Sequence, residues 1–127
     1  MMNYVFVALG AALGGAARYG VYSAVARFSS PIRPIGTLAV NVLGSFLLGV
    51  LIFAFRAESA IDERLKLLLT VGFCGGFTTF STFSLETAYL VRREEYWSAA
   101  ANAGLNVFLT IAGVAAGYLV VKKWFLA

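Results

Sequence analysis

The sequence predicts an all-α integral membrane protein with four transmembrane helices, the third of them broken at mid-membrane. Of its 127 residues, 61% are hydrophobic and only 13% are charged, whereas a soluble domain has roughly 45–50% apolar and about 25% charged residues. The charges fall between apolar runs that are each long enough to cross a bilayer, which takes about 20 helical residues. Four such runs use nearly the whole chain, so we expect a single domain over residues 1–127.

The first two spans are predicted from an uncharged N-terminal run and from the helix breakers that follow it. Residues 1–17 carry no charge, and the apolar pattern continues past Arg18 to about residue 26. Because this run lacks a basic N-terminal region and continues beyond Arg18, we expect no cleavable signal peptide here. Serine and proline residues then end the first helix. The second span covers residues 34–55, and Thr37 is expected to cap it.

Two charged hinges delimit the other spans. Residues 56–66 read RAESAIDERLK, and residues 92–95 read RREE. The third span lies between these hinges over residues 67–85, and the fourth follows over residues 96–121. Aromatic residues lie near several span ends, as membrane-interface anchors do: Tyr4, Tyr96, Trp97 and Trp124.

Basic residues are divided almost evenly between the two sides of the membrane. Orientation is normally set by an excess of Lys and Arg on the cytoplasmic side, and here that excess is nearly absent. We therefore hypothesise dual topology, in which both orientations insert and form an antiparallel dimer. A single orientation set by other features is the alternative. The side with both termini holds Arg56, Arg64, Lys66, Lys122 and Lys123, and the other holds Arg27, Arg33, Arg92 and Arg93.

Composition and spacing argue against several function classes. The chain has no histidine and one cysteine, which excludes histidine-dependent chemistry and a disulfide scaffold. Its net charge of +4 comes from basic residues scattered between apolar blocks, so we expect no nucleic-acid binding. We find no nucleophile–base pair, carboxylate dyad or metal-ligand cluster in the sequence, and we expect no enzymatic activity.

Polar residues form two stripes within the spans, with members four residues apart and hence on one helix face. Polar groups in hydrocarbon either bond helices together or line a path. The stripes therefore indicate either hydrogen bonds between helices or a hydrated path lined by polar side chains. The stripe in the second span is Thr37, Asn41 and Ser45, and the stripe in the fourth is Asn102, Asn106 and Thr110.

The third span is the least regular. Gly75 and Gly76 weaken the helix at mid-membrane, and the hydroxyl-rich run 78–82 does not restore it strongly. Broken backbone at this depth survives only inside protein or along a cavity, where freed carbonyls can bind a monovalent cation and freed N–H groups can face an anion. Phenylalanine recurs every third residue over 77–83; such a stripe is typical of packing, although positive ring edges can also meet a small anion.

Two charged residues lie inside the spans. Glu86 is either a proton site, as in a coupled transporter, or a pairing residue near a helix end. Arg18 pairs with a carboxylate, contacts carbonyl groups at a loop or extends to the membrane interface. The sequence leaves these alternatives open.

The segments GTLAVN at 36–41 and GFCGGFTTFSTFSLE at 72–86 closely resemble the Fluc family of bacterial fluoride channels. The similarity covers essentially the entire chain. It implies passive fluoride export, and hence fluoride resistance, by a dual-topology antiparallel homodimer with two pores in the bacterial plasma (inner) membrane. It also implies a structural sodium ion at the dimer interface.

The resemblance further implies which residues form the site. The backbone carbonyls of Gly75 and Thr78 would bind the sodium ion, and Arg18 would lie near the pore vestibule. Asn106 and Thr110 are matched to the family's fourth helix by spacing alone. The remaining residues implied for the pore are Thr37, Asn41, Phe80, Ser81, Thr82, Phe83 and Glu86.

Two other functions compete with a fluoride channel. The runner-up is a small proton-coupled four-helix exporter. Such exporters depend on a carboxylate in the first helix, which this chain lacks, so Glu86 would have to serve. The third is a membrane assembly factor that transports nothing, in which the polar stripes only bond helices together.

Overall fold

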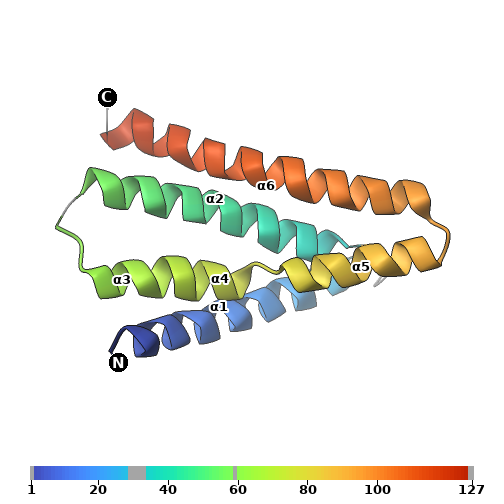
Figure 1. Ribbon diagram of the computed structural model, residues 1–127, viewed down its shortest axis with the longest axis horizontal. Helices are drawn as coiled ribbons and strands as arrows, with labels where there is room; N and C mark the ends of the chain where they lie inside the picture. The colour runs from blue at the N-terminus through green and yellow to red at the C-terminus, as the bar shows by residue number, and fades with distance from the viewer. Residues whose placement is uncertain (1, 29–33, 59, 126–127) are drawn as a thin grey trace.

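The computed structural model describes residues 2–28, 34–58 and 60–125, and every regular element in those ranges is helical (Figure 1). Four helical spans are long and apolar enough to cross a membrane, which confirms the predicted all-α architecture of four spans. The third span consists of α3, η1, α4 and α5. The elements are α1 (Met2–Ala26), α2 (Ile35–Ala57), α3 (Glu63–Leu67), the π-helical segment η1 (Leu68–Cys74), α4 (Gly75–Phe77), α5 (Phe80–Arg92) and α6 (Tyr96–Phe125).

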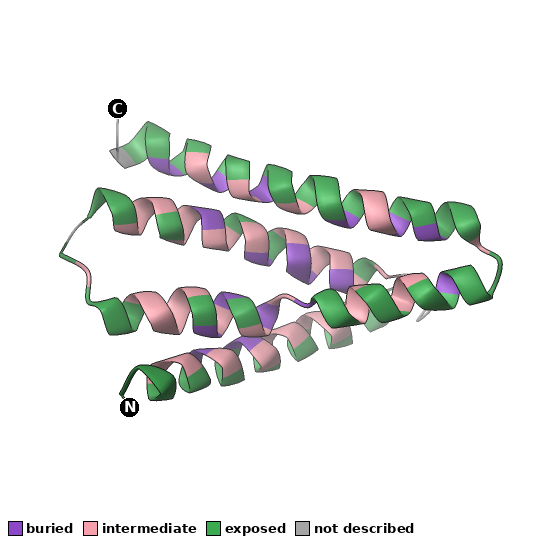
Figure 2. Ribbon diagram, viewed as in Figure 1, coloured by how far each residue is buried: buried purple, intermediate pink, exposed green. Residues whose placement is uncertain are grey.

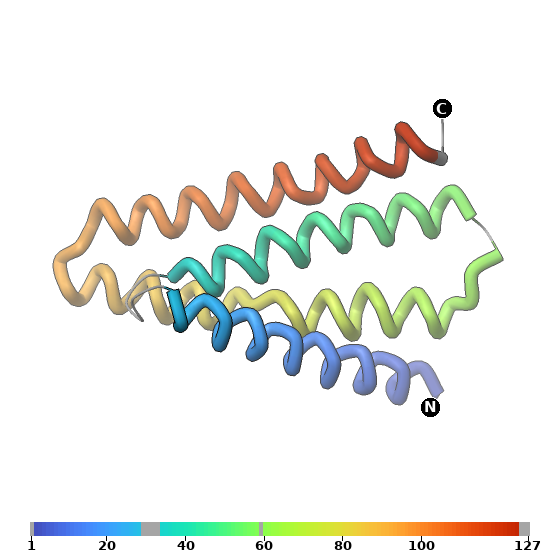
Figure 3. Tube along the Cα trace, turned by 180° about the vertical axis from the view of Figure 1, so that it is seen from behind, coloured from blue at the N-terminus to red at the C-terminus, as the bar shows by residue number. Residues whose placement is uncertain are grey.

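The spans lie side by side along the long axis of the molecule, as opposite views show (Figures 1 and 3). α1 begins and α6 ends at the same end of the bundle, and α2 ends and α3 begins there as well. The turn between α5 and α6 lies at the other end. This arrangement puts the described basic residues at the two ends of the bundle to which the sequence assigns them, whereas Arg33 lies outside the described residues.

Glycine residues let the helices approach closely at two interfaces. α2 packs along α6, where a Cβ on Gly117 would lie 2.6 Å from the Phe46 carbonyl oxygen. α1 packs along η1, where a Cβ on Gly72 would lie 2.8 Å from the Val7 carbonyl oxygen. Lipid supplies no hydrophobic force between helices, so such close van der Waals packing holds the bundle together.

Buried residues follow the lines along which the spans meet, and exposed residues cover the outside (Figure 2). Large apolar side chains such as Leu13 and Phe108 are exposed, as expected of a surface that meets lipid. Several polar side chains of the spans lie inside, where they avoid hydrocarbon. The buried polar residues are Thr37, Asn41, Thr79, Asn102 and Asn106.

The starts of two helices differ from the prediction. α2 begins at Ile35 without a side-chain capping bond, and Thr37 lies inside its first turn, so the predicted capping by Thr37 is wrong. The third span begins earlier than predicted because the Asp62 side chain accepts a hydrogen bond from the Arg64 N–H at 2.7 Å. This cap starts a helix at Glu63, inside the segment expected to be a hinge.

The third span is irregular at two places. η1 winds as a π-helix, a form that often marks functional sites. The helix then stops after α4, where Thr78 has a ψ of 160° and Thr79 a φ of −153°, both extended. Gly75 and Gly76 are themselves helical. The predicted break is therefore present, but it lies at Thr78 and Thr79 rather than at the glycines.

Candidate functional site

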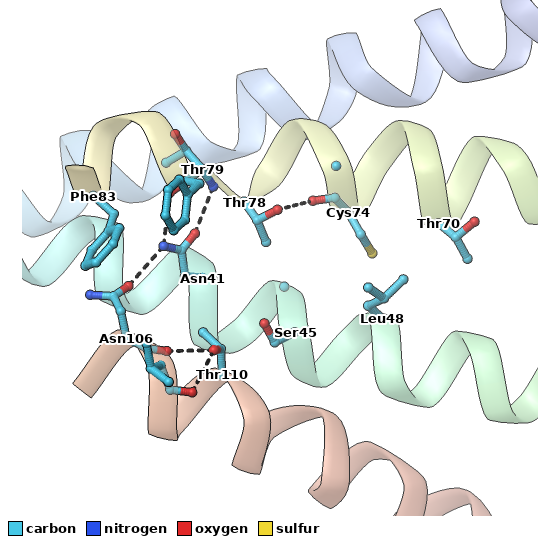
Figure 4. A pocket seen from close by; sticks show the side chains of 14 residues that line it. Asn41, Ser45, Leu48, Thr70, Cys74, Thr78, Thr79, Phe83, Asn106 and Thr110 are labelled. Carbon is cyan, nitrogen blue, oxygen red and sulfur yellow. Dashed lines mark hydrogen bonds between the residues drawn. The ribbon is translucent and has the colours of Figure 1, made fainter. Parts of the chain in front are cut away.

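Asn41 of α2 holds the extended backbone between α4 and α5 (Figure 4). Its side-chain oxygen accepts a hydrogen bond from the Thr79 N–H at 2.8 Å, and its side-chain nitrogen donates to the Thr79 carbonyl oxygen at 3.1 Å. The first of these bonds replaces the helical partner that the Thr79 N–H loses at the break, and the second adds a contact between α2 and the same residue. Because Asn41 is buried, they form away from solvent. A neighbouring helix thus stabilises the break.

Thr79 starts α5 with its own side chain. Its hydroxyl oxygen accepts a hydrogen bond from the Thr82 N–H at 3.2 Å, which is the geometry of an N-cap. The same hydroxyl donates to the Thr82 hydroxyl and lies 3.1 Å from the Ser81 hydroxyl. Ser81 and Thr82, the two hydroxyls implied for the pore, therefore gather around Thr79.

The break also leaves backbone carbonyl groups without helical partners, among them those of Gly75 and Thr78. In a continuous helix the Gly75 carbonyl would accept a bond from the Thr79 N–H, four residues on. The Thr78 carbonyl would likewise accept from the Thr82 N–H. Both N–H groups bond to side-chain oxygens instead, at 2.8 and 3.2 Å. Arg18 of α1 donates to the Thr78 carbonyl oxygen at 3.4 Å, so of the alternatives for Arg18 the contact with a loop carbonyl is confirmed.

A cavity of about 350 Å³ lies beside the break, between α2, α6 and the third span (Figure 4). It brings together seven of the residues that the sequence selects: Asn41, Gly75, Thr78, Phe80, Phe83, Asn106 and Thr110. The other residues that line it are Gly44, Ser45, Leu48, Thr70, Cys74, Thr79 and Val107. The lining thus combines uncharged polar groups with aromatic and aliphatic side chains.

The phenylalanines of the third span divide into two groups. The rings of Phe80 and Phe83 lie 5.2 Å apart, tilted by 54°, and both line the cavity. Phe80 is 77% exposed, at the open side of the cavity. Phe77 instead is buried and stacks on Phe73 at 5.8 Å. Phe77 therefore serves packing, whereas the other two rings face the cavity.

The polar stripes of the second and fourth spans meet each other. The Asn41 side chain donates to the Asn106 side-chain oxygen at 3.0 Å, and Asn106 donates to the side chain of Asn102 at 3.0 Å. Thr110 bonds within its own helix, to the Asn106 carbonyl oxygen at 2.6 Å. Interhelical hydrogen bonding is therefore confirmed for this pair of stripes, and Asn106 and Thr110 also line the cavity.

Glu86, Thr37 and Arg18 do not line the cavity. The Thr37 hydroxyl donates to Glu86 Oε1 at 2.7 Å, and the Tyr22 hydroxyl lies 3.2 Å from the Thr37 hydroxyl. Glu86 therefore pairs across helices, as one of its two alternatives predicts. Within the described ranges its other oxygen, Oε2, is buried without a hydrogen-bond partner.

Sequence reasoning missed Thr79 and Tyr22. Thr79 was detectable, because a threonine directly before an apolar-periodic segment, and after a weakened helix, is typical of an N-cap. Tyr22 gave no signal, since an isolated aromatic residue in an apolar span looks like any other lipid-facing or packing residue.

In the part of the chain that the structure describes, no three or more His, Cys, Asp or Glu side chains gather where they could hold a metal ion. A cation at the break would therefore need other oxygen ligands, such as backbone carbonyl groups.

Comparisons with known proteins identify the family. The family model described as CrcB-like protein, Camphor Resistance (CrcB), matches residues 5–118. The fluoride-specific ion channel FluC of Coxiella burnetii (strain Dugway 5J108-111) is 44% identical over 123 residues, which cover 96% of this chain and 99% of its own. The FluC of Cereibacter sphaeroides (strain ATCC 17029 / ATH 2.4.9) is 45% identical over 118 residues, 93% of each chain.

A third relative extends the match to the whole length. The fluoride-specific ion channel FluC of Caulobacter vibrioides (strain NA1000 / CB15N) is 42% identical over 127 residues, covering 98% of this chain and 99% of its own. The relatives are ion channels, and the family resemblance noted in the sequence is confirmed. The chain therefore belongs to the CrcB/FluC family of fluoride-specific ion channels.

Proposed function

We propose that this chain is a passive, fluoride-selective channel that lets fluoride leave a bacterial cell across its plasma membrane. The observation that carries the proposal is that a fluoride-specific ion channel matches 96% of the chain at 44% identity. Four candidate spans support a multi-pass membrane protein. The cavity beside the break supports an ion path, because it holds uncharged polar groups inside the bundle.

An anion in this cavity would be held weakly. The ring edges of Phe80 and Phe83 carry partial positive charge, and the Asn106 amide and Thr110 hydroxyl lie in the same lining. Both N–H groups of Asn41 already bond within the chain, so an anion there competes with existing contacts. Weak binding suits conduction, because the ion must leave as readily as it enters.

The other proposed pore residues extend the path beyond the cavity. Ser81 and Thr82 add hydroxyl groups at the start of α5. Arg18, which donates to the Thr78 carbonyl oxygen, is proposed to lie near the pore vestibule, where its positive charge would attract an anion. Thr37 and Glu86 form a polar pair farther along α2 and α5. The proposed path therefore runs along α5 and along the faces of α2 and α6 that carry the polar stripes.

A second copy in the opposite orientation would close the cavity and give two pores per antiparallel dimer. Phe80 is 77% exposed in the single chain. A Cβ on Gly75 would meet nothing within 4 Å, so this helical glycine costs helix stability without a packing gain inside its own chain. Both features favour contact from outside the chain. The nearly even charge count permits both orientations.

The backbone at the break suits the proposed sodium ion at the dimer interface. The carbonyls of Gly75 and Thr78 are released from helical bonding, and unwound carbonyls are typical sodium ligands in membrane proteins. The Arg18 guanidinium occupies one lone pair of the Thr78 oxygen at 3.4 Å, and a carbonyl oxygen has a second. The residues present therefore fit a sodium ion that would bridge the helix breaks of the two subunits.

Fluoride release from liposomes tests the proposal. Vesicles that contain only the purified protein are loaded with potassium fluoride, diluted into fluoride-free medium and made permeable to potassium with valinomycin. We expect rapid, valinomycin-dependent loss of fluoride, while a matched set of vesicles retains chloride. Retention of both ions by well-folded protein would contradict a channel.

The same vesicles separate a channel from a proton-coupled exporter. The buried Oε2 of Glu86, unpartnered within the described residues, is the observation that favours the exporter. An exporter would require a proton gradient and would stop working in Glu86→Gln. For a passive channel we expect fluoride efflux without a proton gradient.

A further inference from the structure

α5 carries both proposed pore phenylalanines, yet the break separates it from the rest of the third span. Its position therefore depends on contacts with neighbouring helices, and it packs more against α6 than against α2. Because apolar packing between helices in lipid has little hydrophobic driving force, polar contacts gain weight. A hydrogen bond between α5 and α6, such as that from Asn102 to Thr87, therefore helps to hold α5 in place.

A continuous row of hydrogen bonds runs from the break to the middle of α5. It begins at Asn41 and passes through Asn106 to Asn102, each step being 3.0 Å long. Asn102 then donates from its side-chain nitrogen to the Thr87 hydroxyl oxygen at 2.9 Å. The Thr87 hydroxyl donates in turn to the Phe83 carbonyl oxygen at 2.8 Å. The row therefore ends on the residue whose ring lines the cavity.

Thr87 accepts the hydrogen bond that connects Asn102 of α6 to this turn of α5. A hydroxyl has one proton to donate, and Thr87 donates it to Phe83, so it accepts from Asn102. Asn102 is only 5% exposed. Asn106 lines the cavity beside the break, whereas Asn102 lines a second cavity of about 770 Å³. The amide row thus lies where the two cavities follow each other along α6.

We propose that Thr87 is a positioning residue for the ion path: together with Asn102 it fixes the turn of α5 that carries Phe83. The inference rests on the proposed fluoride channel function. Without the Thr87 hydroxyl, the Asn102 amide loses its partner on α5, and the Phe83 ring is free to leave its place in the cavity lining.

Fluoride efflux from liposomes tests this role. Thr87→Val keeps the shape of the side chain and removes the hydroxyl. We expect efflux to fall about 3- to 15-fold, the range by which one interhelical hydrogen bond in a membrane shifts an equilibrium. Thr87→Ser should restore it. The matched control is Ser84→Ala, because exposed Ser84 donates a similar bond to the Phe80 carbonyl oxygen at 2.9 Å within α5; its efflux should equal that of the unaltered chain.

A second measurement reports position without transport. With 4-fluorophenylalanine at position 83, the ¹⁹F resonance should shift or split in Thr87→Val and return to its original place in Thr87→Ser. If Thr87→Val does not fold, Asn102→Leu removes the α6 partner of the same hydrogen bond. We then expect Asn102→Leu to lower fluoride efflux and to shift or split the ¹⁹F resonance. Unchanged efflux with an unchanged resonance, or a loss of efflux that Thr87→Ser does not restore, would overturn the inference.

The two proposals fail separately. If the unaltered chain releases no fluoride, the channel function is wrong, and the ¹⁹F resonance still decides whether Thr87 positions Phe83. If the unaltered chain releases fluoride and Thr87→Val matches it in both measurements, only the role of Thr87 is wrong.

Discussion

Replacing Asn41 with Asp tests whether the clamp on the helix break sets the geometry of the path. The substitution keeps the shape of the side chain and the oxygen that accepts from the Thr79 N–H at 2.8 Å. It removes both N–H donors, which bond to the Thr79 carbonyl oxygen at 3.1 Å and to the Asn106 side-chain oxygen at 3.0 Å. Two oxygens that now accept hydrogen bonds would face a carboxylate instead.

The magnitude follows from those two contacts. Leaving one buried acceptor unsatisfied costs about 1–3 kcal/mol, so the pair costs about 2–6 kcal/mol. Even the lower figure, if it is lost from the conducting arrangement, corresponds to roughly a thirtyfold decrease in a rate. The new negative charge also repels an anion in the cavity. We therefore expect fluoride efflux to fall by about thirtyfold or more.

The assay is valinomycin-dependent fluoride efflux from liposomes, with size-exclusion chromatography to show that the variant keeps the assembly state of the unaltered chain. Asn3→Asp is the control, since it makes the same chemical change at an exposed position in α1. Efflux through Asn41→Asp equal to that through Asn3→Asp would refute the assignment of the clamp to the ion path.

Four further outcomes are expected. Gly76→Ala places a Cβ 2.5 Å from a backbone oxygen of α1 and should lower the thermal unfolding midpoint in detergent. Gly104→Ala, whose Cβ meets nothing within 4 Å, should stabilise the folded protein by about 0.5–1 kcal/mol. Equal midpoints for the two variants would contradict the close packing at Gly76. Thr37→Val loses the 2.7 Å bond to Glu86 and should destabilise by about 1–3 kcal/mol, while Thr37→Ser should not. Glu94 has a φ of 62°, which strains a residue with a side chain. Glu94→Gly removes this strain and should stabilise the folded protein by about 1 kcal/mol without changing fluoride efflux. A lower thermal unfolding midpoint would argue against strain at this turn. Replacing sodium with N-methylglucamine throughout purification should shift the proposed dimer towards monomer in size-exclusion chromatography; an unchanged elution volume would count against the interfacial sodium ion.

The spans and the polar stripes were predictable because they depend on local pattern. A charge-free run long enough to cross a bilayer has few alternatives, and a spacing of four residues puts Asn102 and Asn106 on one face of any helix. What these residues bond to was not predictable. That Asn106 faces Asn41 depends on how α2 and α6 rotate against each other, which tertiary packing decides.

Two of the local errors, the capping by Thr37 and the break at the glycines, have the same cause. Thr37 has a side chain suited to capping, but its hydroxyl bonds to Glu86, which lies on another span. Gly76 has a low helix propensity, yet it stays helical because its missing side chain lets α1 approach its backbone. In both cases a contact distant in sequence outweighs the local preference. Thr79 shows the reverse, because its capping is local and could have been found from the sequence.

The π-helical winding of η1 also bears on how the chain tolerates the loss of a residue during evolution. A π-helical turn accommodates one residue more than an α-helical turn, so a single deletion within Leu68–Cys74 can be absorbed by rewinding the segment as an α-helix. The same deletion in α2 ahead of Asn41 would rotate the residues on one side of it by about 100° relative to the others. We therefore expect single-residue length differences among related chains to be better tolerated in η1 than in α2, with the break and the residues around it left in place.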